Sequence, residues 1–81
     1  MMIGMELTEM HAEWGRRIRR LRREKELTAT AVAQTAGISR NYLHRLENGE
    51  QSPSDEVRLR IASALDVEPG ELFSYDLKDA S

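Results

Sequence analysis

The side chains of this sequence that could do chemistry are cations and amides rather than nucleophiles or acid–base pairs. The 81 residues include two histidines and no cysteine, and no glycine-rich loop or pair of carboxylates is placed to converge on a substrate. His44 has no second histidine or cysteine on its face that would complete a metal site. The sequence therefore predicts no enzyme, no catalytic residue, no metal and no cofactor.

Positive side chains are concentrated in one part of the chain. Residues 16–46 carry nine arginines and lysines against two acidic residues, whereas residues 47–81 carry nine acidic residues against three basic ones. The whole chain has a net charge of −2. This uneven distribution predicts one face that binds a polyanion and another that is kept away from it. A solvated helix face is the plain alternative for the run from Arg16 to Lys25.

The elements that position these side chains are predicted from hydrophobic periodicity and capping residues. Met10, Trp14, Ile18 and Leu21 form one apolar stripe of a helix from about residue 9 to 25, with Thr8 as its N-cap. Further helices are expected over 29–36 after Thr28, over 40–48 after Ser39, from Ser54 to Leu65, and from Pro69 to Phe73.

These helices predict an all-α fold, a compact domain of five short helices around one modest core. We divide the chain into an N-terminal extension over 1–14, expected to be helical from about residue 9, a domain over 15–75 and a tail over 76–81. No segment approaches membrane-spanning length, and the lack of cysteine fits a cytoplasmic location.

The segment Gly37-Ile38-Ser39, between two short predicted helices, is typical of a helix-turn-helix. From Gly15 to Phe73 the sequence resembles the lambda-repressor/Cro-like, or XRE-type, family of DNA-binding domains. The motifs that carry the resemblance are Ile18-Arg19-Arg20-Leu21-Arg22, Leu27-Thr28, Val32-Ala33, Gly37-Ile38-Ser39-Arg40, Leu46-Glu47-Asn48-Gly49, Pro53-Ser54 and Ile61-Ala62-Ser63-Ala64-Leu65. Each motif alone is weak, but their order and spacing together are specific.

The resemblance implies that the helix after Ser39 enters the major groove of double-stranded DNA. It assigns base contacts to Arg40, Asn41, His44 and Arg45. Arginine can pair with guanine, and asparagine with adenine, through two hydrogen bonds. The resemblance assigns phosphate contacts, which fix the position of the protein without selecting a sequence, to Arg16, Arg17, Thr28, Thr30, Ser39, Tyr42 and Asn48. Simple exposure, or packing in the case of Tyr42, is the alternative for these residues.

Three further expectations follow from the resemblance. Arg22 and Glu47 match a pair that is usually a partly buried salt bridge in this family. Ala29 stands where family members often have a glutamine that contacts phosphate, so that contact is either missing or moved to Thr30. In the fourth helix, Asp55 and Arg58 replace residues that are commonly apolar, which shifts the predicted buried stripe towards Val57.

The function implied by the resemblance is a transcriptional regulator of bacterial or phage type, more often a repressor than an activator. It would occupy an operator as a homodimer, and the candidate dimer contacts are Leu72, Phe73, Tyr75 and Leu77. Two other hypotheses stay open. The first is a protein-interaction module, such as an antitoxin or anti-regulator with an unknown protein partner, and the second is a non-specific nucleoid-type binder. A steep fall of affinity with added salt would distinguish DNA binding from the first.

Overall fold

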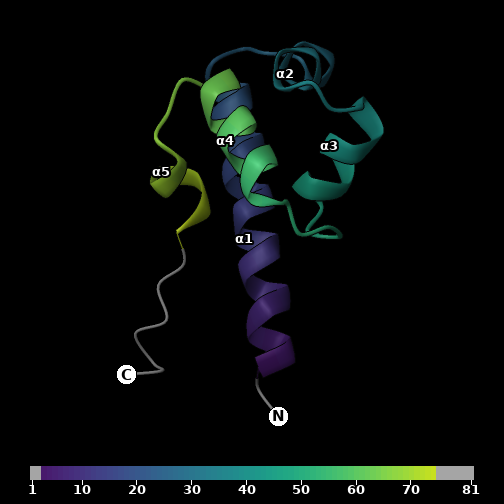
Figure 1. Ribbon diagram of the computed structural model, residues 1–81, viewed down its shortest axis with the longest axis vertical. Helices are drawn as coiled ribbons and strands as arrows, with labels where there is room; N and C mark the ends of the chain where they lie inside the picture. Colours follow the sequence, from purple (N-terminus) through teal and green to yellow (C-terminus); the bar gives the residue numbers. More distant parts are fainter. Residues whose placement is uncertain (1–2, 75–81) are drawn as a thin grey trace.

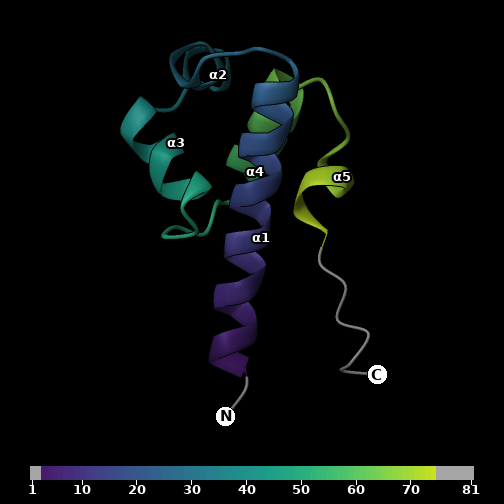
Figure 2. The ribbon, with the colours of Figure 1, turned by 180° about the vertical axis from the view of Figure 1, so that it is seen from behind.

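The computed structural model describes the backbone of residues 3–74 and the side chains of residues 8–74. The described chain forms helices and contains no strand, which confirms the all-α prediction. The helices are α1 (Ile3–Glu24), α2 (Ala29–Ala36), α3 (Arg40–Glu47), α4 (Asp55–Ala64) and α5 (Pro69–Phe73). Helix α1 lies between α3 on one side and α5 on the other, and the two opposite views agree on this (Figures 1 and 2).

The starts of three helices are fixed by hydroxyl caps, as the sequence predicts. Side-chain oxygens of Thr28, Ser39 and Ser54 accept hydrogen bonds from the third backbone N–H of α2, α3 and α4, respectively. Each of these bonds satisfies a donor that the first turn of a helix leaves without an internal partner. Pro69 occupies the first position of α5, where its missing N–H costs nothing.

Helix α1 begins earlier than the sequence analysis expects. It starts at Ile3 rather than near residue 9, and Thr8 therefore lies inside the helix instead of capping it. The residues on both sides of Thr8 include Met, Glu and Leu, which have high helix propensity, so a single threonine does not interrupt them. The helix also runs without a break through Gly15, across the boundary that we drew between extension and domain.

The core fills the space between the helices. It consists of buried side chains from every helix and from the end of α4, namely Trp14, Ile18, Val32, Ala33, Ala36, Leu43, Leu46, Ile61, Ala62, Leu65, Leu72 and Phe73. Helix α2 packs mainly on α4, α3 packs on α1 and α2, and α5 packs on α4 and α1. None of the helices within residues 3–74 is long and apolar enough to cross a membrane.

On the side of the core next to α5, a charged side chain lies among aromatic rings. Arg58 of α4 lies over Trp14 of α1, with 4.6 Å between its guanidinium carbon and the centre of the ring. The ring of Phe73 meets Trp14 edge-on, with the ring centres 5.4 Å apart. The Trp14 Nε1–H donates to the carbonyl oxygen of Ser74 over 3.1 Å. Arg58 thus occupies a commonly apolar position by stacking on aromatic rings, while Val57 is only partly buried.

Candidate nucleic-acid interface

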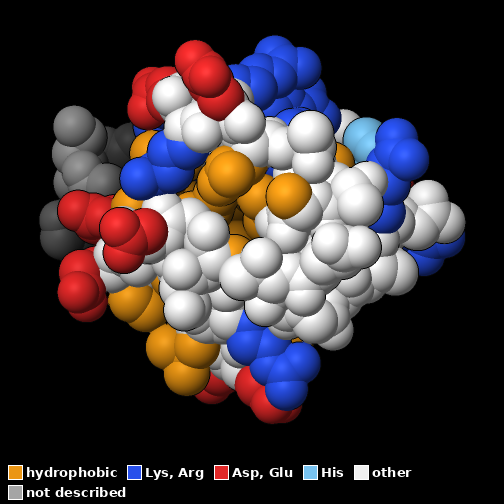
Figure 3. Space-filling view, turned by 90° about the horizontal axis from the view of Figure 1, so that it is seen from above, with side chains coloured by type: hydrophobic (Ala, Val, Ile, Leu, Met, Phe, Trp, Pro, Cys, Tyr) orange, Lys and Arg blue, Asp and Glu red, His pale blue; other side chains and the backbone are white. Residues whose placement is uncertain are grey.

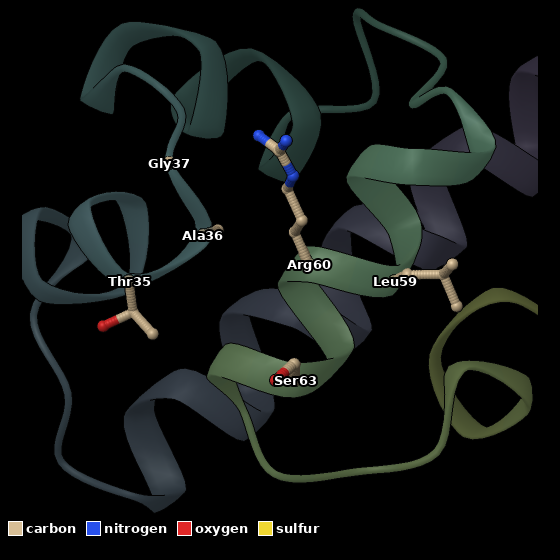
Figure 4. Close-up of a pocket in the computed structure, with 6 residues that line it drawn as sticks. All are labelled: Thr35, Ala36, Gly37, Leu59, Arg60 and Ser63. Atoms are coloured by element: carbon tan, nitrogen blue, oxygen red, sulfur yellow. The ribbon is translucent and has the colours of Figure 1, made fainter.

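The turn between α2 and α3 sets the angle at which α3 leaves the body of the protein. Gly37 has a φ of 72°, in the left-handed region that favours glycine, and closes α2. The N–H of Ile38 donates to the carbonyl oxygen of Ala33, which completes the turn. Behind it lies a hollow between α2 and α4, where Arg60 points towards Gly37 (Figure 4). A side chain at Gly37 would therefore be strained and would also meet Arg60, 3.3 Å away.

Helix α3 has one buried face and one exposed face. Leu43, Leu46 and Glu47 are buried against the body of the protein. The opposite face exposes all the side chains that the sequence assigned to base contacts, which are Arg40, Asn41, His44 and Arg45. No hydrogen bond or ion pair joins any of these side chains to another group within residues 8–74. The structure therefore brings the predicted base contacts together on one surface with their donors and acceptors uncommitted.

Helix α3 is held against α1 by direct contact between the two backbones. A Cβ atom added at Gly15 would lie 2.4 Å from the carbonyl oxygen of Glu47 and 2.5 Å from that of Leu46. Real Cβ atoms do not approach backbone oxygens this closely, so only glycine allows the observed spacing. At the end of α3, Gly49 makes a similar approach to the backbone of Ala12. The position of the exposed face is thus fixed to the rigid axis of α1.

A buried ion pair also joins α1 and α3 and helps to fix their relative orientation. Arg22 Nε and Nη2 donate to the two carboxylate oxygens of Glu47 over 2.7 and 3.1 Å, and the Glu47 side chain is only 1% exposed. Arg22 also donates to the carbonyl oxygen of Leu27. The hydrogen bond with Glu47 raises the pKa of Arg22 above its ordinary value. The pair matches the one expected from the sequence, and it ties α1, α3 and the start of α2 together.

Arg19 belongs to the same cluster, although the sequence analysis did not place it there. Its Nε lies 3.4 Å from Glu47 Oε1, and its Nη2 donates to Asn48 Oδ1 over 2.8 Å. Asn48 caps the C-terminal end of α3 and is exposed. The signal in the sequence was the spacing of Arg19 and Arg22, because residues three apart share a helix face.

The predicted phosphate contacts fall into two groups. One group lies in α2, in α3 and at their capping positions, and all of its members are exposed except the half-buried Tyr42; they are Thr28, Thr30, Ser39, Tyr42 and Asn48. Arg16 and Arg17 form the other group. Arg16 is exposed and lines a shallow hollow on α1 together with Arg19, whereas Arg17 is turned away from the α3 surface. Arg17 donates to Glu13 over 3.0 Å and to the Ser74 carbonyl oxygen over 2.7 Å, which places it on the α5 side.

Glu13 binds both arginines of the second group. Arg16 donates to one of its carboxylate oxygens over 2.8 Å, and Arg17 donates to the other. Hydrogen bonds from Arg16 and then Arg17 hold the pKa of Glu13 below its ordinary value. One carboxylate therefore pairs with both arginines and offsets one of their two positive charges, which the sequence analysis did not anticipate.

The charges of the surface follow the same division. Seen from above, the edge of the molecule where α3 lies carries basic side chains and a histidine, whereas acidic side chains gather at the edge where α5 lies (Figure 3). Glu68 and Glu71 belong to that acidic edge, because they flank the start of α5 and are exposed. A polyanion would thus be attracted to the α3 side and repelled from the α5 side.

The candidate dimer contacts that the structure describes lie in the core rather than on the surface. Leu72 is fully buried in the core of its own protomer and Phe73 is 9% exposed, so neither offers a free apolar surface. Tyr75 and Leu77 lie outside the described residues. Among the described side chains, the large apolar one that stands out is Leu59 of α4, which is 59% exposed.

Comparison with known proteins adds findings on sequence and on structure. The model of the helix-turn-helix domain family matches residues 13–74. The Bacillus subtilis protein YazB, named an uncharacterized HTH-type transcriptional regulator, is 39% identical over 64 residues, which cover 78% of this chain and 93% of that protein. A Pyrococcus horikoshii protein provisionally named an HTH-type transcriptional regulatory protein is 37% identical over 70 residues. That match covers 83% of this chain, which spans only 22% of the length of that relative.

A solved structure has the same arrangement of helices. The crystal structure of the restriction-modification controller protein C.AhdI from Aeromonas hydrophila matches with a TM-score of 0.74 and 39% sequence identity. The match covers 76% of this chain and 94% of C.AhdI.

Proposed function

The chain belongs to the helix-turn-helix domain family, and on this premise we propose that it is a transcriptional regulator that binds one operator sequence in double-stranded DNA as a homodimer. Helix α3 enters the major groove. Arg40, Asn41, His44 and Arg45 contact base edges there. Phosphates are bound from the ends of α2 and α3 by Thr28, Thr30, Ser39, Tyr42 and Asn48.

The observation that carries this proposal is the uncommitted face of α3. A regular hydrogen-bonding surface of arginine, asparagine and histidine stands on a helix whose opposite face is fixed by backbone contact and a buried ion pair. Polar groups that are held rigidly in this way are suited to meeting a partner in one fixed geometry. Arg17 is left out of the proposed contacts because Glu13 and Ser74 already bind it, and Arg16 is left out because it shares Glu13.

Selection of bound duplexes from a randomised pool at near-physiological salt, followed by sequencing, tests the proposal. We expect enrichment of an inverted repeat whose half-sites are about one helical turn, or roughly 34 Å, apart. The matched control is the variant Arg40→Ala/Asn41→Ala, which leaves the buried face of α3 intact and should enrich no repeat. Failure of the folded wild-type chain to enrich any sequence would contradict the proposal and favour the interaction-module hypothesis.

The homodimer is proposed to form through the surface around Leu59. This side chain lines the hollow under Gly37 and extends towards the α5 side (Figure 4). It borders a groove between α4 and α5 whose other walls include Pro69, Gly70 and Phe73. A two-fold axis would place the leucine of each copy in the groove of the other, because an isologous contact needs a protrusion and a recess on the same patch.

Sedimentation of the Leu59→Gln variant tests this surface. We expect a shift towards monomer and a loss of operator affinity, with helical content unchanged because Leu59 contributes little to the core. Leu59→Met is the conservative control and should remain dimeric. An unchanged association state of Leu59→Gln would place the dimer contact elsewhere. Repression, the proposed sign of regulation, is tested with a reporter gene carrying the selected operator upstream.

A further inference from the structure

The arginines of residues 8–74 differ in whether an internal carboxylate neutralises them. Arg16 and Arg17 bind Glu13, Arg19 and Arg22 bind Glu47, Arg58 lies 3.7 Å from Asp55, and Arg60 binds Glu56. Arg20, Arg23, Arg40 and Arg45 have neither an ion pair nor a hydrogen bond within the described side chains. Arg40 and Arg45 stand on the exposed face of α3. Arg20 and Arg23 stand on the exposed face of α1.

Of the two unpaired arginines of α1, Arg23 lies close to the side that meets α3, and Arg20 shares a hollow with it. Arg23 is one helical turn after Arg19, so the two side chains share a face of α1. Arg19 in turn donates to Asn48 at the end of α3. Arg19, Arg20 and Arg23, together with Arg16 and Glu24, line a shallow hollow on the outside of α1.

A hollow lined by several guanidinium groups is suited to a chain of anionic oxygens. Guanidinium groups bind phosphate through paired, charge-assisted hydrogen bonds. An arginine with an internal carboxylate partner has fewer free donors and less uncompensated charge to offer a phosphate. An unpaired and exposed arginine has no such competitor. The pairing pattern therefore distinguishes the cations that serve the fold from those that are available to DNA.

We propose that Arg20 and Arg23 of α1 bind the DNA backbone beside the major groove that α3 occupies, so that the DNA contact extends beyond the helix-turn-helix. This inference rests on the proposed function, because it needs DNA docked on α3. The contact is electrostatic and does not depend on base sequence. Glu24, at the edge of the same hollow, opposes it, and its removal should strengthen binding.

Salt titration of the variants Arg20→Gln and Arg23→Gln tests the proposal. For each, log K should fall less steeply with log salt, by about 0.9 for each phosphate that the variant no longer neutralises. The loss of affinity between about 50 and 200 mM salt should therefore be roughly 3-fold smaller than for the wild type. Selected and random duplexes should be affected alike, and Glu24→Gln should bind both duplexes more tightly than the wild type.

The matched control is Arg60→Gln, which removes the same charge from an exposed arginine that Glu56 already neutralises. This control should keep the wild-type slope. If the wild type binds its selected duplex while Arg20→Gln and Arg23→Gln also keep the wild-type slope, the α1 contact is refuted and the proposed function stands. If the folded wild type binds no duplex at all, both proposals fail.

Discussion

The two sides of α1 hold their neighbours by different means. On the α3 side, contact is directional: two backbones touch at Gly15, and the buried carboxylate of Glu47 is clamped by Arg22. On the α5 side, aromatic rings and a stacked guanidinium meet, hydrogen bonds from Trp14 and Arg17 reach the carbonyl oxygen of Ser74 just after the helix, and the buried Nε of Arg58 has no hydrogen-bond partner. A close backbone contact and a fully satisfied buried ion pair fix a helix more strictly than ring stacking and hydrogen bonds at its C-terminal end. The fold is thus most strictly defined where DNA is proposed to bind.

The largest expected effect is on the free energy of unfolding, when Arg22 on the α3 side and Arg58 on the α5 side are replaced in turn. Arg22→Met should lower the free energy of unfolding by about 3–5 kcal/mol, because Glu47 would stay buried with only its longer contact to Arg19. Arg58→Met should cost about 1 kcal/mol or less, since it removes a stacking contact but also an unsatisfied buried nitrogen. Urea denaturation measures both values. Equal losses would show that the two sides are held alike.

Two glycines offer a second comparison of the same kind. Gly15→Ala places a methyl group against the backbone oxygens of α3, so we expect a loss of about 1–3 kcal/mol despite the better helix propensity of alanine. Gly70→Ala, in α5, meets nothing within 4 Å and should change stability by less than about 0.5 kcal/mol. Thermal unfolding followed by circular dichroism checks both. A harmless Gly15→Ala would mean that α3 can move away from α1 freely.

Operator affinity should also differ between variants of the two sides, in chains that remain folded. Arg40→Ala should cost about 1–3 kcal/mol on the selected operator and relax the preference at one base pair. Arg17→Ala removes the same charge from the α5 side and should leave operator affinity almost unchanged, because Arg17 is bound to Glu13 and Ser74. Fluorescence anisotropy with matched and mismatched duplexes measures the difference. Equal losses on both duplexes for Arg40→Ala would contradict its role in base recognition.

The smallest expected effect is a pH dependence that belongs to the α5 side. Arg16 and Arg17 lower the pKa of Glu13, so its ionised form stabilises the folded chain at neutral pH. This contribution is present above the pKa that Glu13 has in the unfolded chain and disappears as pH falls through the lower, folded value. It should stay below about 1 kcal/mol because the groups are exposed to solvent. Glu13→Gln should therefore be slightly less stable than the wild type at pH 7 and equally stable in strong acid.

Local signals in the sequence accounted for most of the fold. Thr28, Ser39 and Ser54 cap the helices that they were expected to cap, and Gly37 and Pro69 occupy the turn and helix start predicted for them. These residues act through their own backbone conformation or through a hydrogen bond three residues away, which a sequence pattern expresses directly. The start of α1 was placed too late because a threonine that suits an N-cap is also tolerated inside a helix.

The division of the arginines between the two sides was not accessible from the sequence. Arg16, Arg17, Arg19, Arg20, Arg22 and Arg23 have the same chemistry and follow one another along one helix. Their roles depend on Glu47 and on the Ser74 carbonyl oxygen, which approach α1 from distant parts of the chain. The packing of α3 decides which arginines meet Glu47, whereas Glu13 is a neighbour of Arg16 and Arg17 on α1 that their spacing could have indicated. The burial of Leu72 likewise depends on where α5 docks, so its apolar character alone suggested a dimer surface.

Trp14 gives the molecule an intrinsic optical probe on one side only. It is the single tryptophan of the chain, and it is enclosed by Arg58 and Phe73 with its N–H bound to Ser74. Its emission should shift to longer wavelength when α5 detaches and water reaches the indole. Titration with operator DNA should leave that emission steady, because α3 binds on the far side of α1. A spectral change during such a titration would therefore reveal mechanical coupling between the two sides without any added label.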